Sequence, residues 1–148
     1  MENIRDMLTI HEGWKNKPYR DTKGILTIGV GWNIEANKLP DDIAIYLRNN
    51  GQITDDMVSR LLDISIETAT NNCRDIFKDF DTFSEARRFA LIDWMFNCGI
   101  GTILKFKKAL AAINSQDWET VANEMKDSAW YREVGNRAVE VCKMIKEG

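Results

Sequence analysis

The chain has 148 residues, enough for one domain with a hydrophobic core. Hydrophobic residues make up 44%, charged residues 29%, and the formal net charge is -3, so nothing attracts the whole chain to nucleic acid. No apolar run approaches the roughly 20 residues that span a bilayer, and no secretory signal pattern opens the sequence. We therefore expect no nucleic-acid partner, no membrane insertion and no export by a signal peptide.

The first 33 residues predict a helix followed by a small sheet. Apolar side chains recur at helical spacing over residues 2–12, and Gly13 is suited to end that helix. From Pro18 to Asn33 the alternation has a period of two, with a turn signal at Lys23 and Gly24. This pattern predicts a small antiparallel sheet.

The remainder of the chain reads as helical. Pro40 opens a short helix that ends near Gly51, and Thr54 caps a long helix. Ser84, or Thr82 with Glu85 as a capping box, starts an apolar helix that ends at Gly99. Further helices are expected around 103–113, around 116–127 and after Asn136. The fold class is α+β, with a small sheet lobe and a larger helical lobe.

The cysteines and the histidine argue against a metal site. Cys73, Cys98 and Cys142 are widely spaced and odd in number, which is untypical of a disulfide framework or a zinc site, and each is expected to be a core residue. His11 is the only histidine, so the adjacent His-Glu pair cannot belong to a two-histidine zinc motif. We expect no metal and no cofactor.

Two acids and a hydroxyl form the candidate chemistry. Glu12 ends the first helix, where the helix dipole disfavours an ionised carboxylate, and Asp21 lies in a polar loop. One protonated and one ionised carboxyl group are what glycoside hydrolysis uses, and Thr27 could orient a water molecule. From spacing alone a second interpretation stays open, in which Glu12 only ends a helix and Asp21 only caps a turn.

Aromatic side chains and glycines surround these residues in the sequence. Trp14, Tyr19 and Trp32 could stack on sugar rings, although core packing is at least as common for any one of them. Gly29 and Gly31 allow a close approach of the backbone to a ligand.

Three ordered motifs resemble the phage-type lysozymes, the muramidase endolysins of tailed bacteriophages (glycoside hydrolase family 24). The first is Glu12-Gly13, Tyr19-x-Asp21 and Gly24-x-x-Thr27-Ile28-Gly29-x-Gly31. The second runs from Arg87-Arg88 through Ala90-Leu91-Ile92-Asp93 to Phe96-Asn97-x-Gly99, and the third is Trp130-Tyr131 followed by Asn136-Arg137-Ala138. Together they span nearly the whole chain.

The resemblance implies catalytic roles for three residues. Glu12 would be the general acid that protonates the glycosidic oxygen. Asp21 would stabilise the oxocarbenium-like charge and help to place the attacking water, which Thr27 would hold from the opposite face. This arrangement implies inversion at the anomeric carbon.

The resemblance also implies supporting residues. Gly31, Trp32, Phe96 and Asn97 would bind substrate, with Trp32 standing where many relatives carry histidine. Arg137 would reach Glu12 and orient it. A separate inference from matched positions is that His11 contacts Glu140 and braces the first helix against the last.

The implied fold is one lysozyme-like domain over residues 1–148. It would have a sheet lobe over about 13–53, a linking helix over about 55–78, and a helical lobe over about 79–148 together with the N-terminal helix 2–12. The resemblance implies a monomer that cuts the glycan strands of peptidoglycan between N-acetylmuramic acid and N-acetylglucosamine. Its biological role would be host cell lysis.

The protein would accumulate in the host cytoplasm until lysis and act on murein in the periplasm, with a holin-type protein giving access. Two alternatives stay open: a non-catalytic peptidoglycan-binding lysozyme-like module, and an enzyme that cleaves chitin or another glycan.

Overall fold

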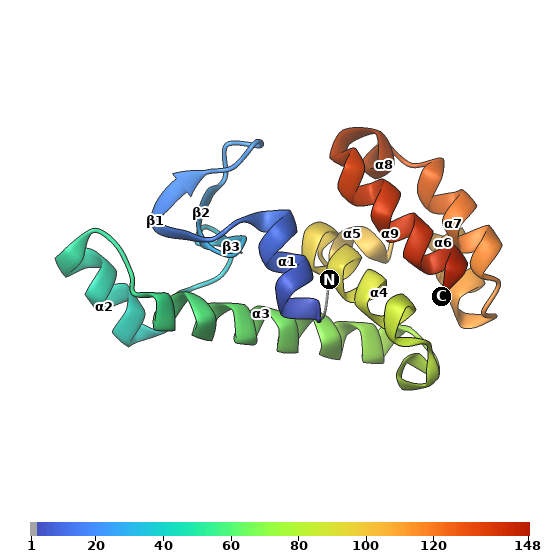
Figure 1. The fold of residues 1–148 in the computed structure, drawn as a ribbon, viewed down its shortest axis with the longest axis horizontal. Helices are drawn as coiled ribbons and strands as arrows, with labels where there is room; N and C mark the ends of the chain where they lie inside the picture. Colours follow the sequence, from blue (N-terminus) through green and yellow to red (C-terminus); the bar gives the residue numbers. More distant parts are fainter. Residues whose placement is uncertain (1–2) are drawn as a thin grey trace. The chain divides into compact units, whose positions relative to one another are not determined.

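The computed structural model describes residues 3–148 and divides into two compact units (Figure 1). The first unit ends at Glu67 and the second begins at Thr68, so the boundary falls inside helix α3 (Asp55–Ile76). A small sheet and several helices confirm the predicted α+β class. The finer subdivision expected from the sequence, with a sheet lobe over 13–53, stays a prediction.

Helix α1 (Ile4–Glu12) opens the first unit. The side chain of Asn3 accepts a hydrogen bond from the backbone N–H of Asp6 at 2.9 Å and so caps the helix. Gly13 ends it with a φ of 83°, as predicted, and its N–H donates to the carbonyl of Thr9. The helix was predicted over 2–12, of which residue 2 lies outside the described residues.

The predicted antiparallel sheet is confirmed. Its strands, in spatial order, are β1 (Lys15–Arg20), β2 (Leu26–Gly29) and β3 (Trp32–Asn33). Lys15 pairs with Gly29 and Tyr19 pairs with Thr27, so β1 advances four residues where β2 advances two. The extra residues make a bulge in β1. The strand itself begins at Lys15, before Pro18, where the sheet was predicted to start.

Helices α2 (Asp41–Asn50) and α3 follow the sheet and have the predicted end signals. Gly51 ends α2 in the left-handed conformation, with its N–H on the carbonyl of Leu47. The hydroxyl of Thr54 accepts from the N–H of Met57 at 3.2 Å at the start of α3. The apolar stripe of α3 supplies Val58, Leu61 and Leu62 to the core of this unit.

Helix α4 (Glu85–Cys98) is the most buried helix of the second unit. Ser84 is its cap and accepts from the N–H of Arg87, whereas the hydroxyl of Thr82 donates to the carbonyl of Asp79. Of the two helix starts that the sequence allowed, the structure therefore has the one capped by Ser84. Six consecutive residues from Ala90 to Met95 are buried, as expected of a helix surrounded by others.

The other elements of this unit are shorter. They are the 3-10 helix η1 (Phe80–Thr82), α5 (Ile100–Ile103), α6 (Lys107–Asn114), α7 (Trp118–Lys126), α8 (Ala129–Val134) and α9 (Asn136–Glu147). The helix predicted around 103–113 is present as α6 but begins only at Lys107, because the chain turns between α5 and α6, and the short helix α5 was not predicted. Helix α8 has six residues, too few for a periodic pattern, and was not predicted.

The helices bury mainly apolar side chains. Among the described residues, no helix combines the length and the apolar character needed to cross a membrane.

Candidate active site

Glu12 is the last residue of α1 and is half-buried. The conformation of Gly13 turns the backbone from the helix into β1, so that the carboxyl group stands where helix and strand meet. A glutamate at this position lies beside the negative end of the helix dipole. The local sequence therefore places an acid at a junction, as predicted.

Asp21 directly follows β1 and is held by the next turn. Its Oδ1 accepts from the backbone N–H of Lys23 at 2.8 Å and from that of Ile25 at 2.9 Å. Its own N–H donates to the carbonyl of Ile25 at 2.9 Å. Asp21 therefore does cap a turn. The N–H groups of Lys23 and Ile25 both bond to Oδ1, so the turn also fixes the direction in which Oδ2 points.

Thr27 lies on β2 and is 4% exposed. Its hydroxyl donates to the carbonyl of Ile25 at 2.8 Å. A hydroxyl group has one proton and two lone pairs, so Thr27 is left able to accept a hydrogen bond, for example from water.

Tyr19 connects these three residues. It is the cross-strand partner of Thr27, and the pKa of its phenol is raised by burial first, then by the negative charges of Glu12 and Asp21. The ring therefore lies in the electrostatic field of both carboxyl groups, which come from the two ends of the β1 segment. Sequence reasoning considered Tyr19 as a ring that could stack on a sugar and noted the Tyr19-x-Asp21 spacing, but it did not predict that both acids act on the phenol.

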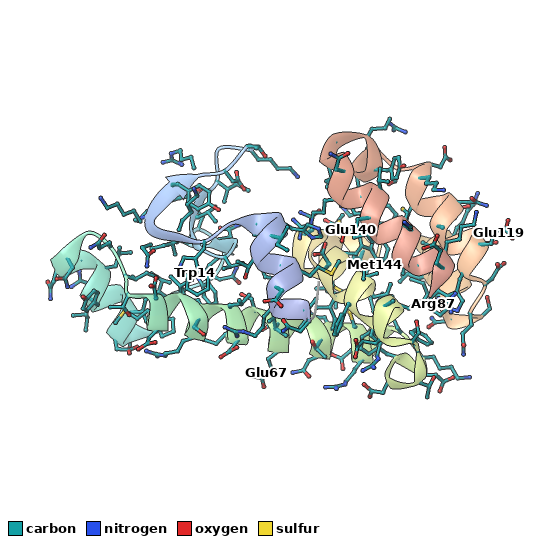
Figure 2. The ribbon with its side chains drawn as sticks, in the orientation of Figure 1. Trp14, Glu67, Arg87, Glu119, Glu140 and Met144 are labelled. Atoms are coloured by element: carbon teal, nitrogen blue, oxygen red, sulfur yellow. The ribbon has the colours of Figure 1, made fainter. Side chains whose placement is uncertain are left out.

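The two tryptophans of this unit have different surroundings. Trp32 is 7% exposed and its indole N–H donates to the carbonyl of Asn37 at 3.1 Å, so little of its ring is open for stacking. Trp14 is 37% exposed and lies beside the start of α3 in Figure 2. Gly31, between β2 and β3, has a φ of 65°, which only glycine adopts without strain.

Two predicted substrate-binding residues lie on α4 in the second unit. Phe96 and Asn97 are both half-buried. The Oδ1 of Asn97 accepts from the indole N–H of Trp130 at 2.7 Å. That oxygen is used to satisfy a buried donor, which leaves the amide NH2 of Asn97 for other partners.

Arg137 and Asp93 form a buried ion pair between α9 and α4. The Nε of Arg137 donates to Oδ1 of Asp93 at 2.9 Å, and their side chains are 10% and 0% exposed. Sequence reasoning quoted Asp93 only as part of a motif and did not predict its ion pair, because nothing in the sequence near Asp93 indicates that Arg137 is its partner. His11 and Glu140 are both half-buried; their contact, and that of Arg137 with Glu12, stay predictions.

Comparison with known proteins identifies the family. The sequence profile of the phage lysozyme family matches residues 9–143, nearly all of the chain. The chain belongs to the phage lysozyme family. As a member of this family it is a glycoside hydrolase, and peptidoglycan is the substrate class of the family.

Proteins similar to this chain differ in source and in length. The chain is 30% identical to probable T4-type lysozyme 1 and 28% identical to probable T4-type lysozyme 2, both of Dictyostelium discoideum, over the whole chain and 96% of each relative. It is 29% identical to the pre-baseplate central spike protein Gp5 of Enterobacteria phage T4, over 99% of this chain and 28% of that protein. Sequences similar to this chain thus occur both as nearly whole proteins and as part of a longer chain.

Proposed function

We propose that this phage lysozyme hydrolyses the β-1,4 bond between N-acetylmuramic acid and N-acetylglucosamine, with Glu12, Asp21 and Thr27 as its catalytic residues. The observation that carries the proposal is the position of Tyr19, whose phenol is affected by Glu12 and Asp21 together and whose strand partner is Thr27. Both carboxyl groups therefore act electrostatically on the residue whose strand partner is Thr27, and all four residues belong to the first unit.

In the proposed mechanism, Glu12 donates its proton to the glycosidic oxygen as the bond to the anomeric carbon breaks. Asp21 stabilises the positive charge that develops on the sugar ring and accepts a proton from a water molecule. That water attacks the anomeric carbon from the face opposite the departing oxygen, so the configuration inverts.

Thr27 has a defined part in this scheme. Since its hydroxyl proton is directed to the carbonyl of Ile25, it accepts a hydrogen bond from the attacking water and does not donate one. This leaves a lone pair of the water directed at the sugar. The buried position of Thr27 on β2 keeps the hydroxyl in a fixed direction.

We further propose a role in host cell lysis, as a monomer that stays in the host cytoplasm until a holin-type protein gives it access to murein. The similar proteins also support a different biological role. A tail-associated lysozyme is the second candidate, because the chain matches a part of the phage spike protein Gp5. A non-catalytic wall-binding module is a weaker alternative, since Glu12, Asp21 and Thr27 are all present.

The test compares Glu12→Gln with Glu67→Gln on purified peptidoglycan. Glu67 is exposed on α3 and undergoes the same chemical change. We expect Glu12→Gln to lose about 100-fold or more in the release of reducing ends, the usual size of a general-acid contribution, and Glu67→Gln to match the unaltered enzyme. Equal activity of Glu12→Gln would remove the catalytic assignment.

Two further measurements address the finer claims. Nuclear magnetic resonance of the first product formed reports its anomeric configuration, and the α anomer is expected for inversion of a β linkage. Mass spectrometry of the products identifies the reducing sugar, which should be N-acetylmuramic acid. An N-acetylglucosamine end would show that another bond is cut.

A further inference from the structure

The bulged segment of β1 lines a groove that reaches Tyr19. Between the pairs Lys15–Gly29 and Tyr19–Thr27, three residues of β1 lie opposite one residue of β2. An open groove of about 510 Å³ is lined by this segment and by Gln52. Bulges often lie next to active sites, because they redirect side chains that a regular strand would point elsewhere.

Hydrogen bonds orient the side chains that line the groove. The indole N–H of Trp14 donates to Oδ1 of Asp55 at 3.0 Å, and the amide of Asn16 donates to the same oxygen at 2.9 Å. Asn16 also bonds to Ile53 twice, through its backbone carbonyl and its side chain, each at 2.9 Å. An exposed ring that is already oriented loses little conformational entropy when a ligand stacks on it.

The chemistry of the lining suits a sugar with acidic substituents. Trp14 offers an aromatic face, Gln52 an amide, and Lys15 and Lys17 two exposed ammonium groups. The pKa of Asp55 is lowered by its bonds from Asn16 and Trp14, so its charge is engaged with these donors. The groove therefore combines an apolar platform with a local positive charge in a chain whose net charge is negative.

Tyr19 joins this groove to the acids. It lines the groove, and its phenol lies in the field of Glu12 and Asp21. A strand of glycan bound at the acids could thus extend along the bulge without leaving the first unit.

We propose that the bulge of β1 is an additional peptidoglycan-binding site, where a sugar ring of the bound strand stacks on Trp14 and carboxylates of its peptide stems pair with Lys15 and Lys17. The inference rests on the proposed function, since it takes the same polymer as ligand. It assigns the positive charge of β1 to recognition of the peptide stems.

The test uses two substrates, intact peptidoglycan and glycan strands from which the peptide stems have been removed. The variants are Trp14→Ala and the double variant Lys15→Gln with Lys17→Gln, and the matched control is Lys107→Gln with Lys108→Gln on α6. We expect Trp14→Ala to raise KM about fivefold to tenfold on both substrates with kcat kept, as for loss of binding common to ground and transition states. The Lys15 and Lys17 double variant should raise KM on intact peptidoglycan alone, and less so at high salt.

A binding measurement makes the test independent of catalysis. In the full chain labelled with 15N, the indole resonance of Trp14 is assigned by its loss in Trp14→Phe and followed during titration with soluble peptidoglycan fragments. We expect this resonance to shift at fragment concentrations that saturate the enzyme. An unmoved Trp14 resonance in an active enzyme, or unchanged KM in both variants, would overturn the proposed site.

The two proposals fail in different ways. If the proposed function is wrong, the unaltered enzyme releases no reducing ends from peptidoglycan. If only the additional site is wrong, the unaltered enzyme is active and its activity is insensitive to Trp14, Lys15 and Lys17. Lys15 and Lys17 are exposed, so their replacement by Gln should leave the fold intact and keep the test valid should Trp14→Ala unfold.

Discussion

Arg137 and Asp93 form a charge-assisted hydrogen bond of 2.9 Å that joins α9 to α4, with Asp93 fully buried. Removing one partner of such a pair takes a charge-assisted hydrogen bond away from the other residue, which stays largely buried, and breaking a buried pair in this way costs about 3–5 kcal/mol. We therefore expect Asp93→Ala to lower the free energy of unfolding by about 3 kcal/mol or more, measured by urea denaturation.

A double-mutant cycle tests whether this cost belongs to the pair. Arg137→Ala in the Asp93→Ala background should cost clearly less than Arg137→Ala alone, because the partner charge is already gone. Asp75→Ala, an exposed aspartate on α3, serves as the control and should change stability by about 0.5 kcal/mol or less. Additive losses would show that the two residues act separately.

Gly29 ends β2 with a φ of 68°. A Cβ at this position would lie 3.6 Å from Val58 Cγ1 and 3.8 Å from Leu61 Cδ1, which are ordinary contacts. The expected cost of Gly29→Ala is therefore the backbone strain of about 1–2 kcal/mol. Gly101→Ala in α5 should change stability in the opposite direction, because alanine is the better helix former and nothing lies within 4 Å of the added atom. Thermal unfolding of both variants checks the two signs.

The raised pKa of Tyr19 predicts a late phenol titration. Burial is the largest cause, followed by the charges of Glu12 and Asp21, so Glu12→Gln and Asp21→Asn should each lower the pKa of Tyr19 part of the way towards its usual value of 10.0. Ultraviolet absorbance of the phenolate follows the titration, and Tyr19→Phe assigns it. If neither variant moves the Tyr19 titration, the two acids do not share a site.

The same shift has a consequence for stability. With its pKa raised in the folded state, Tyr19 keeps its proton in the folded chain at a pH where the unfolded chain has lost it. The folded state then binds more protons, so this contribution to stability is complete below about pH 10 and is lost as the pH rises further. Tyr19→Phe should remove this part of the loss of stability at alkaline pH, which unfolding measurements at several pH values would detect.

The cysteines give a prediction for chemical modification. Burial raises the pKa of the Cys142 thiol to about 11, only partly offset by Lys126, and burial also raises the pKa of Cys73. Since the thiolate is the reactive form, neither should react with a disulfide reagent at pH 8 in the folded protein. Cys98 is half-buried at the end of α4, so at most one thiol should react before unfolding and three after. Two or more fast-reacting thiols in the folded protein would contradict this.

Local signals in the sequence predicted much of the fold. Gly13, Gly51 and Gly99 each end a helix, and Asp21 follows the first strand, because caps, turns and periodic patterns depend on neighbouring residues. The break between α5 and α6 and the six-residue helix α8 were missed, since short helices owe their stability to tertiary packing.

For the candidate site, too, local sequence determined some features and tertiary structure determined others. The sequence by itself determined which acids and hydroxyl are available and on which elements they lie, because these follow from spacing within about 15 residues. Which tryptophan ring is open to solvent depends on distant partners: Trp14 is oriented by Asp55, 41 positions away, whereas Trp32 is buried.

The bulge of β1 and the ion pair of Asp93 with Arg137, 44 positions apart, likewise belong to the tertiary structure. Strand register and the pairing of buried charges are set by which surfaces meet when the chain folds. That choice is a balance of packing and desolvation over the whole unit, so it leaves no local pattern in the sequence.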